Sequence, residues 1–305
     1  MSKKQLQTNE ETRKIYHEQH KRVAGDEIAM RRFMSMLDTD YFNVEADFFK
    51  GKKVLDAGCG DTAKLSIKFA KLGATVVGCD LGEDFIPIAE ASVARWGGSN
   101  AISFESANVI DLPFEDESFD FVCCHGVLLH LADFEQVDMA FSELSRVLKK
   151  GGALYTVYGV VGGLIEKAII PAVREYYSNN TDFRVFIDNI DTADFASIYE
   201  FSERLSQQMG IDLELDKDKL AELFDTDFCV MLQNIIQAPV RLEISEEFVR
   251  NLYQKNGFGE VARLRRFVKR RNVRKYFAPL HFEYENKISN LFYGSGNLEF
   301  ISYKH

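Results

Sequence analysis

The stretch VLDAGCGD at residues 54–61 combines a tight glycine turn with two carboxylates. Gly58 and Gly60 would let a ligand approach the backbone closely, as happens where a first strand turns into a helix. A dinucleotide site would add a third glycine and rest a pyrophosphate on the helix N-terminus, and that glycine is absent from this turn. Asp56 and Asp61 would repel a pyrophosphate by like charge. The turn therefore favours a ligand that carries positive charge.

A third carboxylate, Asp80, ends the next apolar segment, ATVVGCD at residues 74–80. An acid at the end of that strand can accept hydrogen bonds from both hydroxyls of a ribose. S-adenosylmethionine has a ribose, a sulfonium and an ammonium group and no phosphate, so it suits Asp80 and the acidic turn together. A helix N-cap or a solvated loop acid stays open as the alternative for Asp80.

The elements that must position these residues alternate between strand and helix. The strand segments are expected at residues 52–58, 74–80, 101–108, 119–125 and 151–159, and the helical segments at 62–73, 85–96 and 126–150. Alternation at this spacing predicts parallel βαβ units in an α/β, doubly wound sheet.

The remainder of the chain suggests a lead-in, an insertion and a return to the sheet. Residues 1–50 are expected to form an N-terminal helical segment, with helical spacing of apolar residues between 10 and 37. Residues 164–245 have a mostly helical pattern and are expected to be an insertion after strand five. Strand-like stretches near 258–268 and at 297–303 would complete the sheet, so the main domain is predicted to comprise residues 51–163 and 246–305.

Four motifs in this order resemble a known family. VLDAGCGD, VVGCDLG, NVIDLPFEDESFDFV and ELSRVLKKGGALY look like the class I S-adenosylmethionine-dependent methyltransferases, in the form found in small-molecule enzymes of the ubiquinone/menaquinone methyltransferase type. The resemblance covers residues 50–160. It implies a seven-stranded Rossmann-like sheet, S-adenosylmethionine as cofactor and S-adenosylhomocysteine as product.

The resemblance also assigns residues to the methionine end of the cofactor. Asp56, Gly58 and Gly60 would surround the methionine moiety, and Cys59 would line the turn. His125, just past the fourth strand segment, would lie where sulfonium and acceptor meet. A purely structural role for His125 is the alternative.

At the nucleoside end, the resemblance implies four further residues. Asp80 would bind the ribose hydroxyls and Leu81 would lie against the adenine. Asn108 stands where the family usually has an acid that accepts from the adenine amino group, and an amide oxygen can accept the same bond without charge. Val109 would offer its backbone N–H to the ring, or else only pack.

Methyl transfer is an in-line displacement at carbon, so positioning and desolvation supply most of the acceleration. A general base helps only if the acceptor must lose a proton. The predicted catalytic residues are His125, His130 and Tyr158, with Tyr155 as a further candidate. The family often has two adjacent histidines after the fourth strand, and here only His130 remains. Structural histidines and packed aromatic rings are the alternatives.

No metal site is expected. His17, Glu18 and His20 do not share one helical face, so a solvated helix is the favoured interpretation. The five cysteines show no CxxC spacing, which fits a reducing cytoplasm. Cys123 and Cys124 would point to opposite faces of a strand as core residues.

The sequence says least about the methyl acceptor. The insertion is rich in aromatic residues, which would form either a closed apolar acceptor pocket or simply the insertion's own core. Residues 261–275 hold eight basic residues and no acid, and would form either a solvated face or a site for an anion: Arg263, Arg265, Arg266, Lys269, Arg270, Arg271, Arg274 and Lys275.

The main hypothesis is a cytoplasmic methyltransferase that acts on oxygen or nitrogen of a small molecule, with an anionic acceptor as one option. The alternatives are an RNA- or protein-modifying enzyme that uses residues 261–275, and a non-catalytic S-adenosylmethionine-binding protein. The net charge of −10 disfavours nucleic acid as a partner. The longest apolar stretch, residues 151–165, is too short for a membrane span, and a homodimer is left open.

Overall fold

The computed structural model of the chain describes most of the protein. The described residues are 3–24, 30–31, 34, 39–98, 100–189, 199–200, 203–204, 206–207, 210, 233–264 and 287–305. Most of the basic stretch, from Arg265 to Lys275, and a large part of the expected insertion lie outside them.

A seven-stranded sheet forms the centre of the protein, in the order β3-β2-β1-β4-β5-β7-β6. The strands are β1 Lys53–Ala57, β2 Thr75–Asp80, β3 Ile102–Ser106, β4 Phe119–His125, β5 Leu148–Val161, β6 Ala262–Arg263 and β7 Gly296–Tyr303. The first five run parallel, and β7 is antiparallel to β5 and to β6. The predicted doubly wound, seven-stranded Rossmann-like sheet is confirmed.

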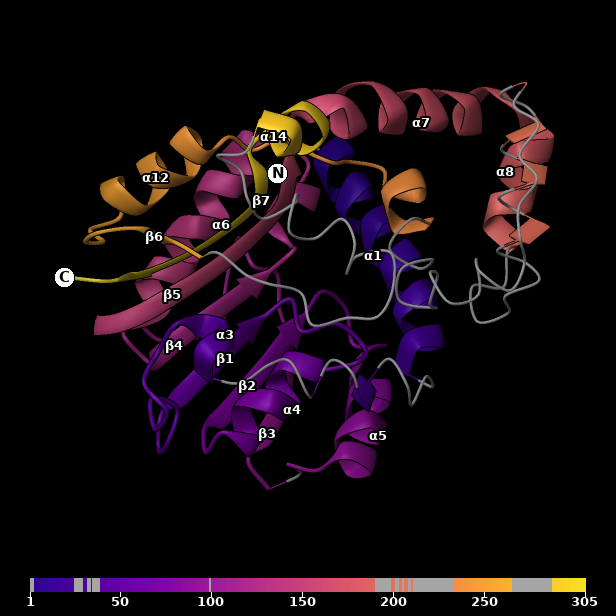
Figure 1. The fold of residues 1–305 in the computed structure, drawn as a ribbon. Coiled ribbons are helices and arrows are strands. Elements are labelled where there is room, and N and C mark those ends of the chain that lie inside the picture. The colour runs from indigo at the N-terminus through magenta and orange to yellow at the C-terminus, as the bar shows by residue number, and fades with distance from the viewer. Residues whose placement is uncertain are drawn as a thin grey trace.

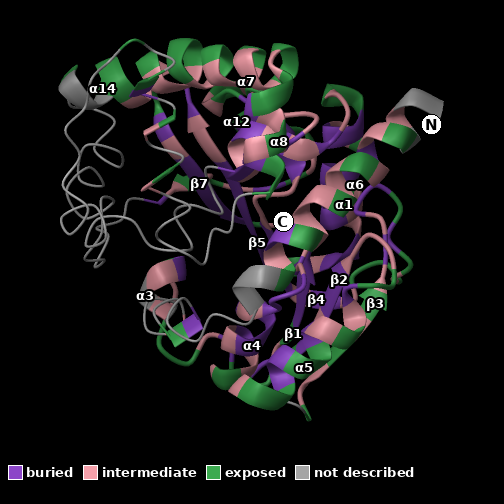
Figure 2. Ribbon diagram, turned by 90° about the vertical axis from the view of Figure 1, so that its right-hand side faces the viewer, coloured by how far each residue is buried: buried purple, intermediate pink, exposed green. Residues whose placement is uncertain are grey.

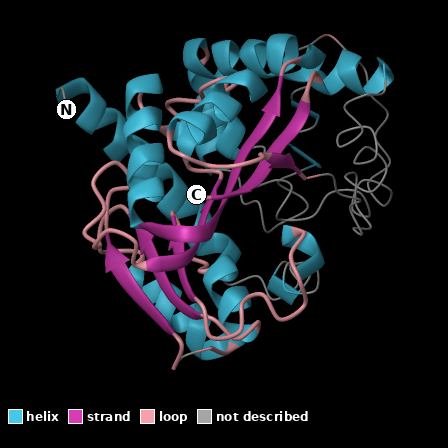
Figure 3. Ribbon diagram, turned by 90° about the vertical axis from the view of Figure 1, so that its left-hand side faces the viewer, coloured by secondary structure: helices cyan, strands magenta, loops and turns pink. Residues whose placement is uncertain are grey.

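Helices cover both faces of the sheet (Figure 3). On one face lie α3 Thr39–Phe42, α4 Lys64–Lys71 and α5 Ile86–Trp96, and on the other α6 Phe134–Val147 and α12 Glu246–Lys255. Two of these helices begin at residues typical of helix N-caps. Asp133 and Ser245 accept hydrogen bonds from the first-turn N–H groups of α6 and α12. Because Asp133 starts a new helix, the expected helix at 126–150 is instead a 3-10 turn, η1 Leu128–His130, followed by α6.

The two largest clusters of buried residues lie one on each side of the sheet, and buried residues concentrate in its strands (Figure 2). A smaller cluster joins α4 and α5. Along a strand the side chains alternate between the faces. Cys123 accordingly lies in the cluster under α3 and α4, and Cys124 in the cluster under α6 and α12, as the sequence predicts.

The remaining helices lie away from the sheet's faces. They are α1 Lys3–Ala24, the π-helical segment η2 Ile165–Ile169, α7 Ile170–Asn179, α8 Thr181–Asn189 and α14 Lys287–Tyr293. In Figure 1, α1 stands between the sheet and α8, while α7 crosses the top of the view towards α8. No helix in the described part of the chain is long and apolar enough to cross a membrane.

The described aromatic residues of the insertion pack on one another. Phe183 and Ile187 of α8 form a small buried cluster with Ile236, against which Tyr176 and Phe186 pack. This matches the alternative that the rings make the insertion's own core. Other aromatic residues of the insertion, such as Phe195, Phe224 and Phe228, lie outside the described residues.

Candidate active site

The glycine turn after β1 is fixed to the end of β2 by backbone hydrogen bonds. The N–H groups of Gly58 and Cys59 both donate to the carbonyl oxygen of Cys79, at 2.7 and 3.0 Å. Gly58 has φ +82°, and a Cβ there would lie 2.1 Å from Cγ2 of Val127. This position therefore requires glycine for both its conformation and its close approach to the segment after β4.

Asp80 lies beside this turn, at the carboxyl end of β2. Its two carboxylate oxygens accept hydrogen bonds from the N–H groups of Gly60, at 2.8 Å, and Leu81, at 2.7 Å. Burial raises the pKa of Asp80, and the two N–H donors act in the opposite direction. The carboxylate is thus held in one orientation at the edge where ligands bind in open α/β sheets.

Asp56 is completely buried behind the turn. One oxygen accepts from the Ser66 hydroxyl at 2.6 Å, whereas Oδ1 has no hydrogen-bond partner among the described residues. Burial raises the pKa of Asp56 from 3.8 to about 7, and Ser66 opposes that shift. A buried carboxylate oxygen without a partner is costly unless a donor or a positive charge comes near it.

Asp61 is paired with a residue of the N-terminal helix. Asp61 is 2% exposed, and its Oδ1 lies 2.6 Å from Nδ1 of His17. Burial raises the pKa of Asp61 to about 6, and His17 acts against this shift. The prediction that His17 lies on a solvated helix face is therefore wrong. His20 also lies close, since a Cβ on Gly60 would be 3.0 Å from its Nδ1. Among the described residues no group of three candidate ligands could hold a metal ion.

Helix α1 bonds both to the region of the glycine turn and to the segment of η1 and α6. Towards the glycine turn, Arg13 forms an ion pair with Asp84, next to the contact between His17 and Asp61. Towards η1 and α6, the side-chain amides of Gln5 and Asn9 donate to Asp133, at 2.7 Å, and Gln136, at 3.2 Å. The helix therefore covers the glycine turn through polar contacts.

The expected adenine residues lie in the loop after β3. The side-chain oxygen of Asn108 accepts from the N–H of Ile110 at 3.2 Å, so an adenine amino group would share an oxygen that is already engaged. Val109 is 6% exposed and packs in the core below α6. Its N–H donates to no backbone carbonyl of the described residues.

His130 is fixed by two partners. The strap defined by residues 238–242 passes beside it, and Nδ1 of His130 lies 3.0 Å from the carbonyl oxygen of Val240. A carbonyl only accepts, so Nδ1 carries the proton and Nε2 accepts from the hydroxyl of Tyr16, 2.7 Å away. Burial lowers the pKa of His130 to about 4, with Arg241 and Arg174 acting in the same direction. The ring is therefore neutral at physiological pH.

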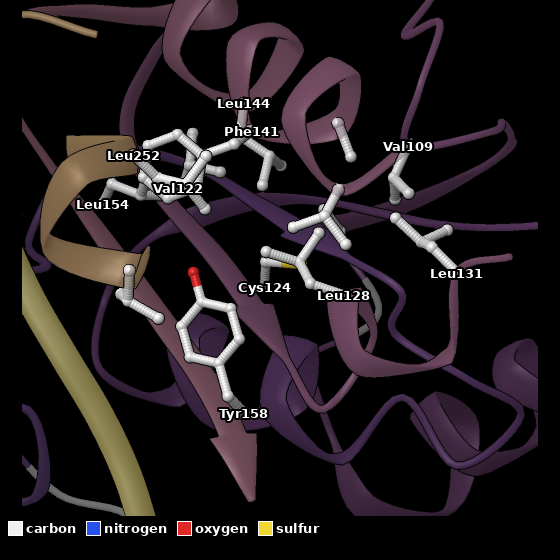
Figure 4. Packing of buried hydrophobic residues seen from close by; sticks show 14 of the residues in the cluster. Val109, Val122, Cys124, Leu128, Leu131, Phe141, Leu144, Leu154, Tyr158 and Leu252 are labelled. Atoms are coloured by element: carbon white, nitrogen blue, oxygen red, sulfur yellow. The ribbon is translucent and has the colours of Figure 1, made fainter. Parts of the chain in front are cut away.

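The other proposed bases lie elsewhere. His125 is half-buried at the end of β4, with its ring 6.3 Å from that of Tyr155. The hydroxyl of Tyr155 donates to Glu299 inside the protein. Tyr158 is 1% exposed, and its hydroxyl points into the hydrophobic cluster on the side of Leu154 and Leu252 (Figure 4). Burial raises the pKa of Tyr158 well above its usual value, so its surroundings assign it to core packing rather than to proton transfer.

Sequence reasoning missed the contribution of α1. Arg13, Tyr16, His17 and His20 follow the spacing i, i+3, i+4 and i+7, which places them on one face of a helix. A polar stripe of this kind on an otherwise solvated helix is the signal that could have indicated docking over a site.

Known proteins share part of this sequence. Residues 55–156 match a family model described as a methyltransferase domain. The chain is 31% identical over 143 residues to Methyltransferase GfsG of Streptomyces halstedii, which covers 47% of this chain and 50% of that protein. It is 31% identical over 178 residues to the demethylmenaquinone methyltransferase of Staphylococcus haemolyticus, which covers 57% of this chain and 67% of that protein.

The structure is also similar to that of a SAM-dependent methyltransferase from Methanosarcina mazei, with a TM-score of 0.47, 20% identity, and coverage of 88% of this chain and 99% of that one. The chain spans about half the length of the first two curated relatives, at 50% and 54%. By the family model and the demethylmenaquinone methyltransferase match, the chain belongs to the class I S-adenosylmethionine-dependent methyltransferases.

The residues present fit the cofactor of that family. The partnerless Oδ1 of Asp56 suits a ligand that brings a positive charge or a donor, and Gly58 and Gly60 leave the backbone accessible. The oriented carboxylate of Asp80 suits a pair of ribose hydroxyls. The carboxylates of Asp56 and Asp61 beside the turn would repel a pyrophosphate.

Proposed function

We propose that this protein transfers a methyl group from S-adenosylmethionine to an oxygen or nitrogen atom of a small-molecule acceptor. The observation that carries the proposal is the set of carboxylates at the glycine turn: Asp80 held by two N–H groups, and Asp56 with one buried oxygen that lacks a partner among the described residues. Relatives named demethylmenaquinone methyltransferase and ubiquinone biosynthesis O-methyltransferase support a small molecule as acceptor.

When bound, S-adenosylmethionine supplies a methyl group on a cationic sulfur, and S-adenosylhomocysteine remains. In this proposal Asp80 orients the ribose, with Leu81 against the adenine. Asn108 and Val109 meet the edge of the adenine, and His125 lies towards the acceptor. The turn residues Asp56, Gly58, Cys59 and Gly60 surround the methionine end.

The division of labour follows the proposed domains. Residues 51–163 and 246–305 would hold the cofactor, residues 164–245 would cover the acceptor, and the N-terminal segment 1–50 would close over both through α1. The polar contacts of α1 with Asp61, Asp84 and His130 support this arrangement.

Tyr16 and His130 form the described pair that would face an acceptor proton. A pKa of about 4 makes His130 a weak base, so we assign it as a positioning residue that holds the Tyr16 hydroxyl. Its neutrality also matters because a protonated ring would repel a nearby sulfonium. Positioning rather than strong base catalysis is sufficient for this reaction, since the leaving group is already activated.

The alternative that uses the basic stretch receives no support from its described part. Arg263 has a side chain that is 4% exposed and forms an ion pair with Glu246. It also donates to the carbonyl oxygens of Ser295 and Asn297. The sequence left open a solvated face or an anion site for this arginine, and its buried, paired side chain fits neither. The other seven basic residues lie outside the described part of the chain.

The test is release of S-adenosylhomocysteine by the purified protein with a panel of phenols and amines, each with and without a carboxylate or phosphate group. We expect release with at least one acceptor, and none from Asp80→Ala under the same conditions. Cofactor binding without release across the panel would favour the non-catalytic binding protein. Methylation of RNA or protein but of no small molecule would overturn the proposed acceptor class.

A further inference from the structure

The strap, residues 238–242, passes along the acceptor side of the site and is fixed from several directions. The N–H of Leu242 donates to the carbonyl oxygen of Leu129 at 2.7 Å, and the ring of His130 donates to that of Val240 at 3.0 Å. The strap is therefore tied to η1 at two neighbouring points.

Arg174 of α7 reaches the other end of the same segment. Its Nη2 donates to the carbonyl oxygen of Ala238 at 2.8 Å, and its Nη1 donates to Ile235 at 2.7 Å and, more weakly, to Ile236 at 3.4 Å. Ala238 and Val240 are two residues apart, so their Cα atoms are separated by at most about 7 Å. Arg174 and His130 thus flank one short span of backbone.

The charge of Arg174 is not neutralised by a carboxylate in the described part of the chain. Its partners among the described residues are neutral carbonyl groups, and a guanidinium has five N–H donors, so these residues leave donors for a ligand. Arg241, also on the strap, differs because it forms a two-point ion pair with Glu166, at 2.8 and 2.9 Å.

The described charged groups around Arg174 leave an excess of positive charge. Glu166 pairs with Arg241, while Asp188 of the nearby α8 accepts from Tyr177, at 2.6 Å, and from Gln237, at 2.9 Å. The two arginines and Glu166 leave one net positive charge. Burial lowers the pKa of Arg174 from its ordinary value, and Arg241 acts in the same direction. An arginine nevertheless stays protonated, so an anion beside it would be stabilising.

We propose that Arg174 forms a subsite for an oxyanion group on the methyl acceptor, whose reactive atom would then lie near Tyr16 and His130. The inference rests on the proposed function and narrows it to small acceptors that carry a carboxylate, phosphate or sulfate. It places the anion site on the insertion rather than on the basic stretch. The short span between Arg174 and His130 limits the acceptor to a compact molecule.

Calorimetry at fixed ionic strength, with the protein saturated with S-adenosylhomocysteine, tests the subsite with inorganic phosphate, sulfate and benzoate as probes. The variant Arg174→Gln keeps a donor but removes the charge, and Arg184→Gln, on the neighbouring α8, is the matched control. We expect at least one probe to bind the wild type and Arg184→Gln equally, and to bind Arg174→Gln at least about tenfold more weakly. The probe that binds best identifies the kind of oxyanion.

Protection of the wild-type protein provides a second measurement that does not depend on a variant folding. Phenylglyoxal modifies guanidinium groups, and mass spectrometry can follow its rate at each arginine. The best-binding probe should slow modification at Arg174 and leave Arg184 unchanged. No binding of any probe, equal binding by Arg174→Gln, or equal modification rates would overturn the subsite. Failure of the wild type to bind S-adenosylhomocysteine at all would instead refute the proposed function.

Discussion

Replacing Asp80 by alanine should separate cofactor binding from folding. In the proposed complex its carboxylate accepts two hydrogen bonds from the ribose, each of about 1.5–3 kcal/mol because the acceptor is charged. Together they correspond to about 3–6 kcal/mol, and each 1.4 kcal/mol is tenfold in affinity. The N–H groups of Gly60 and Leu81 would be freed to bind water or ligand, so we take at least about tenfold as the expected loss.

The same substitution should change stability much less. It leaves two backbone N–H groups without Asp80, which is destabilising, but it also removes a carboxylate whose pKa is raised by burial, which is stabilising. These effects oppose each other. We therefore expect the free energy of unfolding to change far less than the binding free energy.

Titration calorimetry with S-adenosylhomocysteine, together with urea unfolding of the same samples, would measure both quantities. Asp182→Ala, an exposed acid in the first turn of α8, is the matched control and should bind like the wild type. Unchanged affinity in folded Asp80→Ala would refute the ribose assignment and return Asp80 to the role of a loop acid.

Three further predictions test the surroundings of the site. Gly58→Ala should destabilise the protein severely in urea unfolding, because the new Cβ would lie 2.1 Å from Val127. The control Gly51→Ala has φ +69° and no atom within 4 Å of its Cβ, so it should cost only about 1–2 kcal/mol of backbone strain. The pKa of Asp56 is about 7 in the folded state and near 3.8 in the unfolded state, so the free energy of unfolding of the wild type should fall as the pH rises from about 4 to 7, relative to that of Asp56→Asn. Parallel pH profiles of the two proteins would contradict this. Tyr16→Phe leaves the buried Nε2 of His130 without its donor and should lower the free energy of unfolding by about 1–3 kcal/mol. Tyr177→Phe is the control and should cost less, because the hydrogen bond of the Tyr177 hydroxyl is exposed.

The fold and the cofactor half of the site could be predicted because their signals are local. Short apolar segments that alternate with amphipathic helices specify the order of parallel strands. Gly58, Gly60 and Asp80 lie at the ends of those segments, so their convergence follows from parallel strands ending at one edge of the sheet.

The part of the proposed site that would face the acceptor depends on contacts between residues far apart in the sequence. Nothing near His17 in the sequence indicates that it meets Asp61, and nothing near His130 indicates Tyr16 or Val240. Tyr158 shows a different limit. The alternation of side chains along β5 places Tyr158 on one face of the sheet, but core clusters cover both faces of that strand. The sequence alone therefore could not show whether Tyr158 packs in the core or lines the site.

The central claim is that the acidic glycine turn selects S-adenosylmethionine over a dinucleotide. Competitive calorimetry of the full chain with S-adenosylhomocysteine and NAD measures this directly. We expect S-adenosylhomocysteine to bind at least about a hundredfold more tightly, a difference of about 2.7 kcal/mol, because a pyrophosphate would meet Asp56 and Asp61 at a turn that lacks the third glycine. Tight binding of NAD without a response to S-adenosylhomocysteine would contradict the account.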